Sequence, residues 1–589
     1  MSANIAVRLA LILSLLVVAV PSYSANDLFQ SPRTYDSGDG DVPFSGAQSI
    51  AVGDVNGDHY RDLLVANLCN GCSHGLVGVL LGNGDGSFQG ATSYPSGGWG
   101  AQTIATGDVD RDGRLDVVVG NVCSSLCLLG DPGGVGVLLG NGDGTFQPAQ
   151  TYPSGDQPSF GTNGWLRLAD INHDGELDIV VANRSDTAVL LGNGDGTFRP
   201  AQHHGSGADA IELADVNGDG NLDLLAGSYK NVAVLLGDGI GGFETMQSYY
   251  AGGKTVSAIV VKDVNADKKP DLLVANQCRG DISYCGGSGF IGVLLGNGDG
   301  TFMPAQSYRS GGLRAHSLGV MDANEDGFQD LVVSNTCLSP TNCNAGVVGV
   351  LLGNGDGTFQ PVQRYNTGSP IAVFVTVDDV NADYKPDILV ANLDAVSVLL
   401  GRFMTIITLH SSPNPAVYGQ SVSLVANITS HAPTAPSGKV TLTNGRGWSR
   451  QLTLNGGAAS ATTRMLPAGL STLTAVYYGD VESIKSRSVA VAQMVNRATS
   501  VTAIVSSVNP AIQGDPVTFT ATVTSPTARV TGMVTFKAGG VVLGTIPLVG
   551  QKASFTTSEL PSGKSWITAT YDGNENFVSS KASMTQNVH

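Results

Sequence analysis

A nine-residue acidic segment recurs seven times between residues 54 and 387 of this chain. The fullest copy is Asp215–Asp223, which reads D-V-N-G-D-G-N-L-D. Repeats spaced a few tens of residues apart are typical of solenoids and propellers. The chain is therefore expected to fold as an array of similar units rather than around one core. The copies begin at Asp54, Asp108, Asp170, Asp215, Asp263, Asp322 and Asp379.

Each copy offers oxygen ligands in an alternating pattern. Acidic or amide side chains stand at the first, third, fifth and ninth places, and glycine stands at the sixth place in four of the copies. A hard cation such as Ca²⁺ takes about six to eight oxygens, which a tight loop with alternate residues pointing inward can supply. We therefore expect up to seven structural Ca²⁺ ions. The expected side-chain ligands are Asp54, Asn56, Asp58, Asp62, Asp108, Asp110, Asp112, Asp116, Asp170, Asn172, Asp174, Asp178, Asp215, Asn217, Asp219, Asp223, Asp263, Asn265, Asp267, Asp271, Asp322, Asn324, Asp326, Asp330, Asp379, Asn381, Asp383 and Asp387.

These calcium loops are not EF-hands. An EF-hand has a glutamate at its twelfth place, whereas the twelfth residue counted from Asp215 is Ala226, within an apolar run. Each loop is therefore expected to lead into a β-strand. His59, Lys268 and Tyr384 replace the glycine at the sixth place in the other three copies, which leaves calcium binding by those three loops open.

The sequence around each loop accounts for four strands. In the first repeat these are Ser49–Gly53, Leu63–Asn67, Val77–Gly82 and Phe88–Tyr94. Apolar residues in the second strand do not alternate with polar ones, which indicates that both faces are buried. Four strands are the size of one propeller blade.

The two ends of the array complement each other. The seventh repeat stops at Phe403 without a fourth strand, while Phe29…Tyr35 near the start resembles Phe146…Tyr152 in the second repeat. An N-terminal strand in the last blade would remove an exposed sheet edge. The sequence thus predicts a seven-bladed β-propeller.

The loops, together with the recurring V-L-L-G-N-G-D-G-T-F segment, resemble FG-GAP/VCBS repeats, the blade type of the integrin α-chain head. The resemblance covers about Leu28 to Phe403 and recurs seven times. It implies a calcium-laced propeller that serves adhesion or ligand binding.

The C-terminal third has a different composition and an internal duplication. Ser411–Pro415 is echoed by Ser506–Pro510, and alternating segments such as Val517–Val523 indicate half-buried strands. Each half resembles a bacterial Ig-like sandwich. The predicted fold is all-β, with a signal peptide at 1–25, a propeller at 26–403 and Ig-like domains at 404–496 and 497–589.

The N-terminus and the charge indicate an exported protein. Leu9–Val20 is an apolar run with Arg8 before it and small residues after it, as in a secretory signal peptide. No later segment is apolar enough to span a membrane, so the mature protein is expected to be secreted or held at the cell surface. A formal net charge of −18 argues against nucleic acid as a partner.

All eight cysteines stand in local pairs within the propeller region. A zinc or redox site is one reading of the C-x-x-C pair at Cys69 and Cys72. In an exported protein, four loop disulfides are the favoured interpretation. The pairs are Cys69/Cys72, Cys123/Cys127, Cys278/Cys285 and Cys337/Cys343.

We expect a binding protein whose propeller head recognises an extracellular polysaccharide or protein and is carried on an Ig-like stalk. The connections opposite the calcium loops vary in length, and binding usually resides in variable loops on a fixed scaffold. Long loops of blades one, two, five and six should border a groove. The expected aromatic contacts are Trp99 and Phe160, in links between blades, and Tyr284, in one of the long loops.

No catalytic constellation is recognised, so no enzymatic activity is expected. The alternative is an extracellular polysaccharide lyase or hydrolase with its site on the propeller. Arg279-Gly280-Asp281 matches an integrin-binding tripeptide, but so short a match arises readily by chance in a glycine-rich chain.

Overall fold

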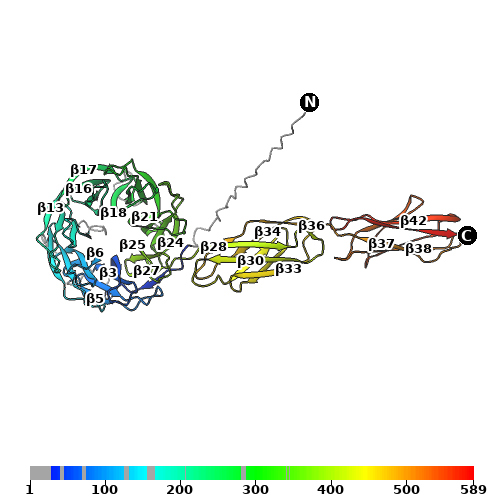
Figure 1. Cartoon of the computed structure of the whole chain (residues 1–589), viewed down its shortest axis with the longest axis horizontal. Coiled ribbons are helices and arrows are strands. Elements are labelled where there is room, and N and C mark those ends of the chain that lie inside the picture. The colour runs from blue at the N-terminus through cyan, green and yellow to red at the C-terminus, as the bar shows by residue number, and fades with distance from the viewer. Residues whose placement is uncertain are drawn as a thin grey trace, which may run out of the picture. The chain divides into compact units, whose positions relative to one another are not determined.

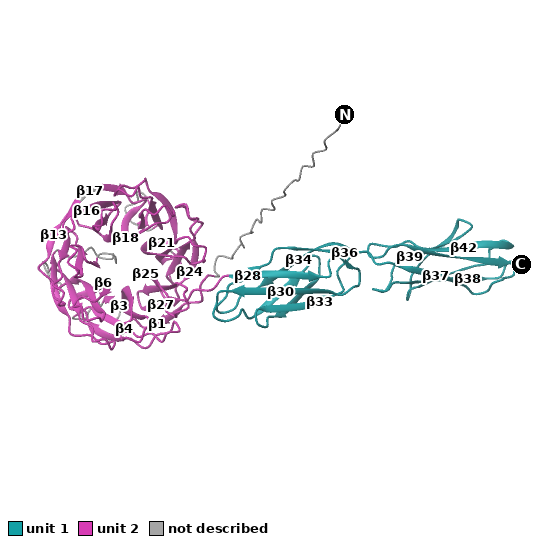
Figure 2. Ribbon diagram, in the orientation of Figure 1, with its two compact units in different colours: residues 1–23, 405–589 teal, residues 24–404 magenta. Residues whose placement is uncertain are grey.

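The computed structural model describes residues 28–39, 46–68, 74–124, 132–155, 166–205, 207–279, 287–339, 341–343 and 345–589, with the backbone alone for Thr245 and Met246. Two compact units are present, Ser24–Met404 and a unit that contains Thr405–His589 (Figure 2). Every regular element within the described ranges is a β-strand (Figure 1). The predicted all-β class is therefore confirmed, while the predicted signal peptide lies outside the described residues.

The unit Ser24–Met404 is a seven-bladed propeller, as predicted. Its described strands form antiparallel blades, and the first strands of neighbouring blades contact one another at the centre. Blades five and six share the continuous strand β21. Blade one consists of β2 (Gly46–Gly53), β3 (Asp62–Leu68), β4 (Leu76–Leu80) and β5 (Thr92–Pro95), blade two of β6 (Trp99–Gly107), β7 (Asp116–Cys123), β8 (Gly133–Leu138) and β9 (Gln150–Gly155), and blade three of β10 (Leu166–Ala169), β11 (Asp178–Ala182), β12 (Thr187–Leu190) and β13 (Gln202–His204). Blade four consists of β14 (Ala210–Ala214), β15 (Asp223–Ser228), β16 (Asn231–Gly237) and β17 (Phe243–Tyr250), and blade five of β18 (Lys254–Lys262), β19 (Asp271–Cys278), β20 (Ser288–Leu294) and the first part of β21 (Gln306–Met321). Blade six consists of the rest of β21, β22 (Asp330–Cys337), β23 (Val347–Leu351) and β24 (Gln363–Asn366), and blade seven of β25 (Ala372–Asp378), β26 (Asp387–Asn392), β27 (Ala395–Leu399) and β1 (Arg33–Tyr35).

The N-terminal strand completes the last blade, as the sequence predicts. Strand β1 pairs antiparallel with β27, with Arg33 opposite Val398 and Tyr35 opposite Val396. Beyond the strand, Phe29 forms a bridge with Gly401. Chain segments from the two ends of the propeller therefore lie in one sheet, and β27 has a partner on both sides.

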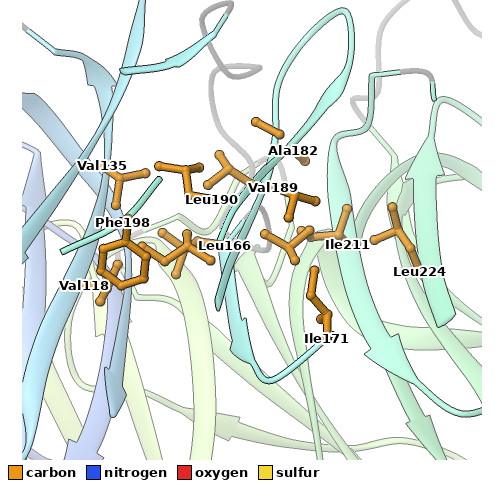
Figure 3. Packing of buried hydrophobic residues seen from close by; sticks show 14 of the residues in the cluster. Val118, Val135, Leu166, Ile171, Ala182, Val189, Leu190, Phe198, Ile211 and Leu224 are labelled. Carbon is orange, nitrogen blue, oxygen red and sulfur yellow. The ribbon is translucent and has the colours of Figure 1, made fainter. Parts of the chain in front are cut away.

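Apolar side chains of neighbouring blades interlock between the sheets. One core cluster joins blades two, three and four, with Val118, Leu166, Phe198, Ile211 and Leu224 among its members (Figure 3). Burying a side chain of this size stabilises the fold by roughly 1.5–3 kcal/mol. The blades thus depend on one another for their core.

The recurring phenylalanine and tyrosine of the outer strands explain how adjacent blades are matched. The aromatic residue that ends one repeat packs edge-on against the phenylalanine of the next, with ring centroids 5.2–6.3 Å apart. Edge-to-face packing is the favoured arrangement at this separation. The pairs are Tyr35–Phe88, Tyr94–Phe146, Tyr152–Phe198, His204–Phe243, Tyr249–Phe302, Tyr308–Phe359 and Tyr365–Phe29.

The C-terminal unit contains two β-sandwiches. The first has one sheet of β28 (Thr405–Ser412), β30 (Val422–Ser430) and β33 (Ala458–Thr463), and another of β29 (Ala416–Val417), β36 (Val491–Asn496), β34 (Gly469–Tyr477), β31 (Lys439–Thr443) and β32 (Ser449–Thr453), with β35 (Ser486–Arg487) beside β34. The second has β37 (Val501–Ser506), β38 (Val517–Thr524) and β41 (Lys552–Thr557) in one sheet, and β40 (Val541–Pro547), β39 (Met533–Ala538), β42 (Gly563–Tyr571) and β43 (Ser580–Val588) in the other. Strand β38 alternates as predicted, since Val517, Phe519, Ala521 and Val523 are buried.

Candidate metal centres

The acidic loops occupy the same place in every blade. Each connects the first strand to the second, and its ninth residue is the first residue of the second strand, as Asp62 is in β3 and Asp116 in β7. In blades one, two and four the loop also contacts the next blade; in blade one, for example, the carbonyl of Val55 accepts the N–H of Gly144 at 3.0 Å. The loops and the N-G-D-G turns therefore lie at the same face of the propeller, called the calcium-loop face below.

The backbone of each loop wraps around its first aspartate. In all seven loops, which lie wholly within the described residues, the N–H of the sixth residue donates to this carboxylate, as Gly220 does to Asp215 at 2.9 Å. The N–H of the seventh residue likewise donates to the fifth-place aspartate in each loop. The sixth-place donors are His59, Gly113, Gly175, Gly220, Lys268, Gly327 and Tyr384, and the seventh-place donors are Tyr60, Arg114, Glu176, Asn221, Lys269, Phe328 and Lys385.

The three loops without glycine at the sixth place fold like the others. His59, Lys268 and Tyr384 adopt φ values of 70°, 66° and 67°, which is the left-handed region that glycine enters most easily. Their N–H groups still reach the first aspartate. The substitution thus changes the conformational cost of these loops and leaves their ligand positions in place.

The ninth-place aspartate has a second role in the fold. Asp62 accepts the N–H of Val55 on one oxygen (2.9 Å) and that of Gly82 on the other (2.8 Å), so it ties the loop to the end of the third strand. All seven ninth-place aspartates make both bonds, to residues Val55/Gly82, Val109/Gly140, Ile171/Gly192, Val216/Gly237, Val264/Gly296, Ala323/Gly353 and Val380/Gly401.

Burial of these carboxyl groups opposes their charge. It is the main cause that raises the pKa of Asp116 and Asp178 to about 6, of Asp330 to about 7 and of Asp387 to about 8. The backbone N–H groups that donate to these aspartates lower their pKa values. Two other carboxylates of the same loop raise them further, such as Asp326 and Asp322 for Asp330, and Asp383 and Asp379 for Asp387. A site that gathers carboxylates against such a cost is one where a cation would favour the ionised form.

The donor set fits a hard cation on two further observations. Oxygen atoms of Asp108, Asp110 and Asp116 lie within 4.8 Å of one another. In the third loop, the buried Oδ1 of Asp170 has no hydrogen-bond partner among the described residues. Clustered carboxylate and amide oxygens without nitrogen or sulfur ligands are the set that Ca²⁺ prefers.

The cysteine predictions are supported where they can be followed. Cys337 and Cys343 form a disulfide with their Cα atoms 4.6 Å apart. Cys123 and Cys278 are also disulfide-bonded, while Cys69, Cys72, Cys127 and Cys285 lie outside the described residues. No free cysteine occurs in the part of the chain that the structure describes.

We expect thiol titration of unreduced mature protein to find no reactive cysteine. Reduction of Cys337–Cys343 is expected to cost only about 2 kcal/mol, because the closed loop is short. Thiol counting under denaturing conditions checks the absence of reactive cysteines, and melting with and without reductant measures the loss of stability. Zinc release with titratable thiols would contradict the disulfide interpretation.

The predicted ligand contacts are only partly described. Trp99 lies at the predicted edge, half-buried, as the first residue of β6 opposite Cys123, and so belongs to a strand rather than to a loop between blades. Phe160 and Tyr284 lie outside the described residues, as do the tips of the long loops that would border the predicted groove.

A cavity of about 200 Å³ lies among the innermost strands at the centre of the propeller. Its lining includes Arg167, Ser257 and His316. Arg167 is paired with Glu212 at 3.0 Å, and the hydroxyl of Ser257 donates to the carbonyl of Ala315. Burial, with Arg314 as a lesser cause, lowers the pKa of His316 to about 4, so this ring is neutral at physiological pH. These polar groups join strands and blades together.

Sequence reasoning missed the double use of the ninth-place aspartates. The signal that could have found it is the glycine that ends the third strand of every repeat, such as Gly82 or Gly401. A backbone N–H at that position needs an acceptor once the strand ends. The hydrogen bond between this N–H and the ninth-place aspartate depends on the turn between strands, and it is visible only in the folded blade.

Family models match segments in both parts of the chain. The FG-GAP-like repeat model matches residues 54–119, 126–181, 170–226 and 215–274. The model of the bacterial Ig-like domain (group 3) matches residues 409–496 and 504–589. No curated protein matches the chain.

Similar solved structures include a lectin from Agrocybe aegerita, described for specific recognition of non-reducing terminal N-acetylglucosamine. It is 22% identical with a TM-score of 0.38, and the match covers 59% of this chain and 86% of the lectin chain. The fibronectin(III)-like modules of CbhA from Clostridium thermocellum are 17% identical with a TM-score of 0.15, and that match covers 31% and 95% of the two chains. In the described residues, no helix is long and apolar enough to cross a membrane.

Proposed function

Because this chain carries FG-GAP-like repeats and two bacterial Ig-like domains, we propose that it is an extracellular ligand-binding protein. Both domain types are typical of extracellular adhesion or ligand-binding proteins and are generally not catalytic. In the proposal, the propeller head binds a polysaccharide or protein, and the Ig-like pair serves as its stalk.

Calcium has a structural role in this proposal. The loops would hold it through the four side-chain positions given above, and the bound ion would offset the carboxylate charge that each loop gathers. The backbone bonds to the first and ninth aspartates are repeated in every blade, so the ions would brace a common scaffold rather than one specific site.

The contrast between the two faces carries the proposal. The calcium-loop face repeats one hydrogen-bond pattern, whereas the second-to-third strand connections on the opposite face differ. In blade four this connection is the short turn at Tyr229 and Lys230, but in blade six it runs from Cys337 to Val347 and contains a disulfide. Variable connections on a rigid scaffold are where binding specificity usually resides.

A glycan and protein array, probed with the full mature chain in calcium and in chelator, tests the proposal. We expect calcium-dependent binding to at least one ligand, and Trp99→Ala is expected to weaken binding without changing the melting temperature of the propeller. The array is also scored for cleavage, because a lyase or hydrolase is the alternative. Product formation from a bound polysaccharide would favour that alternative, and absence of any ligand would contradict the binding proposal.

A further inference from the structure

A group of cations lies at the propeller edge opposite the acidic loops. On the calcium-loop face, basic side chains form ion pairs with loop carboxylates, as Arg111 does with Glu176 at 2.8 Å and Lys385 with Glu325 at 2.8 Å. At the opposite edge of blades four and five, Lys230, Arg279 and Arg309 are exposed and form no ion pair with any described residue. In a chain of formal net charge −18, this edge therefore presents a local group of positive charges away from the acidic loops.

The strand register aligns these cations across blade five. Lys254 begins β18 opposite Cys278, the residue before Arg279, and Phe290 of β20 lies opposite Arg309 of β21. Since Asp271 is at the other end of β19, all these residues lie at the edge opposite the calcium loops. They run from the innermost strand of the blade to its outermost strand.

The turn of blade four extends this line across the seam between blades. The carbonyl of Tyr229 accepts the N–H of Val256 at 3.1 Å, and the carbonyl of Lys230 accepts that of Ala251 at 2.8 Å. The ammonium of Lys254 lies 5.2 Å from the centre of the Tyr229 ring. We call Tyr229, Lys230, Lys254, Arg279, Phe290 and Arg309 the basic strip.

Phe290 holds two guanidinium groups in place. The central carbon of Arg279 lies 5.5 Å from its ring centre and that of Arg309 lies 5.9 Å away, while the phenyl ring itself is buried. A guanidinium stacked on an aromatic face is oriented by the contact and keeps its N–H groups available for a carboxylate. Arg309 donates one of these N–H groups to the hydroxyl of Ser288 at 3.4 Å.

Exposed aromatic rings accompany the charges. Tyr229 is 56% exposed and Tyr250, opposite Asn231 at the end of β17, is 53% exposed. Rings of this kind stack on the apolar faces of sugars. The half-buried Asp209 accepts the N–H of Tyr229 at 3.4 Å.

We propose that the basic strip binds an acidic polysaccharide, with sugar carboxylates on Arg279 and Arg309 and sugar rings against Tyr229. The inference rests on the proposed binding function and names its ligand class. A line of contacts that crosses two blades suits several consecutive sugar units, and the planar guanidinium matches a carboxylate in two hydrogen bonds. Nucleic acid and acidic protein are the competing ligands that the test separates.

The test measures binding of a hyaluronan oligosaccharide, which carries a carboxylate on alternate sugars, to the full mature chain in calcium. Calorimetric titration at low salt is expected to show binding that weakens as salt screens the charges. The double variant Arg279→Gln/Arg309→Gln should bind about tenfold more weakly, as expected for two lost charge pairs. Tyr229→Ala should also weaken binding.

The matched control is Lys262→Gln. Lys262 is exposed at the calcium-loop end of β18, the strand that begins with Lys254. If the basic strip alone binds the polysaccharide, removal of the Lys262 charge should change the affinity for hyaluronan by less than about twofold. A neutral chitin oligosaccharide, single-stranded DNA and polyglutamate serve as competitors. None should displace hyaluronan at equal concentration of sugar, nucleotide or residue.

Equal affinity of the double variant and the parent would overturn the inference, as would equal binding of DNA or polyglutamate. The array could instead yield a ligand whose affinity is unchanged by the two arginine substitutions, while hyaluronan does not bind. That result would overturn the inference and leave the proposed function standing. No ligand of any kind on the array would remove both. Unchanged melting of the double variant in calcium excludes unfolding as the cause of a weaker titration.

Discussion

Chelation of calcium is expected to lower the melting temperature of the propeller by more than about 10 °C. Each ion that binds only the folded state adds about 2.7 kcal/mol when its free concentration is a hundred times its dissociation constant, and several loops contribute together. Without the ion, each loop keeps a buried ninth-place aspartate beside other carboxylates, and this environment raises the pKa of Asp330 to about 7 and of Asp387 to about 8.

Scanning calorimetry of the full chain in calcium and in chelator checks this expectation. The Ig-like unit is the internal control, since the acidic loops are confined to residues 54–387 and its transition should stay in place. Magnesium should restore less stability, because it demands a stricter octahedral geometry. A propeller transition that is unchanged by chelator would contradict the calcium assignment.

The repeat architecture could be predicted from sequence because its signals are local. Loop spacing, strand periodicity and the Phe-to-Tyr interval each recur along the chain, so that Phe29…Tyr35 could be recognised as the missing strand of blade seven. The pairing of β1 with β27 follows from that recognition. Alternation within a nine-residue segment likewise predicts which side chains can point inward together, and in the second loop oxygen atoms of Asp108, Asp110 and Asp116 lie within 4.8 Å of one another.

Side-chain contacts between the strands of one blade could not be predicted in the same way. Arg279, the residue after β19, and Arg309 of β21 both stack on Phe290 of β20, and no motif spacing predicts this contact. The tripeptide match at Arg279 pointed to a different role. Trp99 was predicted to lie in a link between blades, yet β6 begins at Trp99 itself. Such features depend on register and on neighbouring blades, which periodicity does not determine.

Lys385 is the clearest case of a role set by a neighbouring blade. It stands at the seventh place of the last loop, and its side chain is only 3% exposed. Its ammonium pairs with Glu325 at 2.8 Å and donates to the carbonyl of Ala323 at 3.2 Å, both in the sixth loop. The ring of Phe403 lies 6.0 Å away.

The position of Ala323 explains why a lysine is needed. At three other seams, the equivalent carbonyl accepts an N–H from the N-G-D-G turn of the next blade or its counterpart, as Val109 does from Gly196 at 3.2 Å and Val216 from Gly300 at 2.9 Å. Blade seven has no such turn, because its third and fourth strands, β27 and β1, come from opposite ends of the propeller sequence. Lys385 supplies the donor that the missing turn would have provided.

Lys385→Met is therefore expected to lower the free energy of unfolding of the propeller by about 2 kcal/mol. The methionine keeps most of the apolar stem but removes a buried ammonium that pairs with the Glu325 carboxylate and donates to the carbonyl of the buried Ala323, and loss of the donor to a buried acceptor is costly. Denaturant unfolding in saturating calcium measures the change. Lys269→Met is the matched control, since Lys269 stands at the same loop position in blade five and is exposed; a change there should stay within about 0.5 kcal/mol. Equal losses for the two variants would show that the seam between blades six and seven does not depend on the Lys385 ammonium.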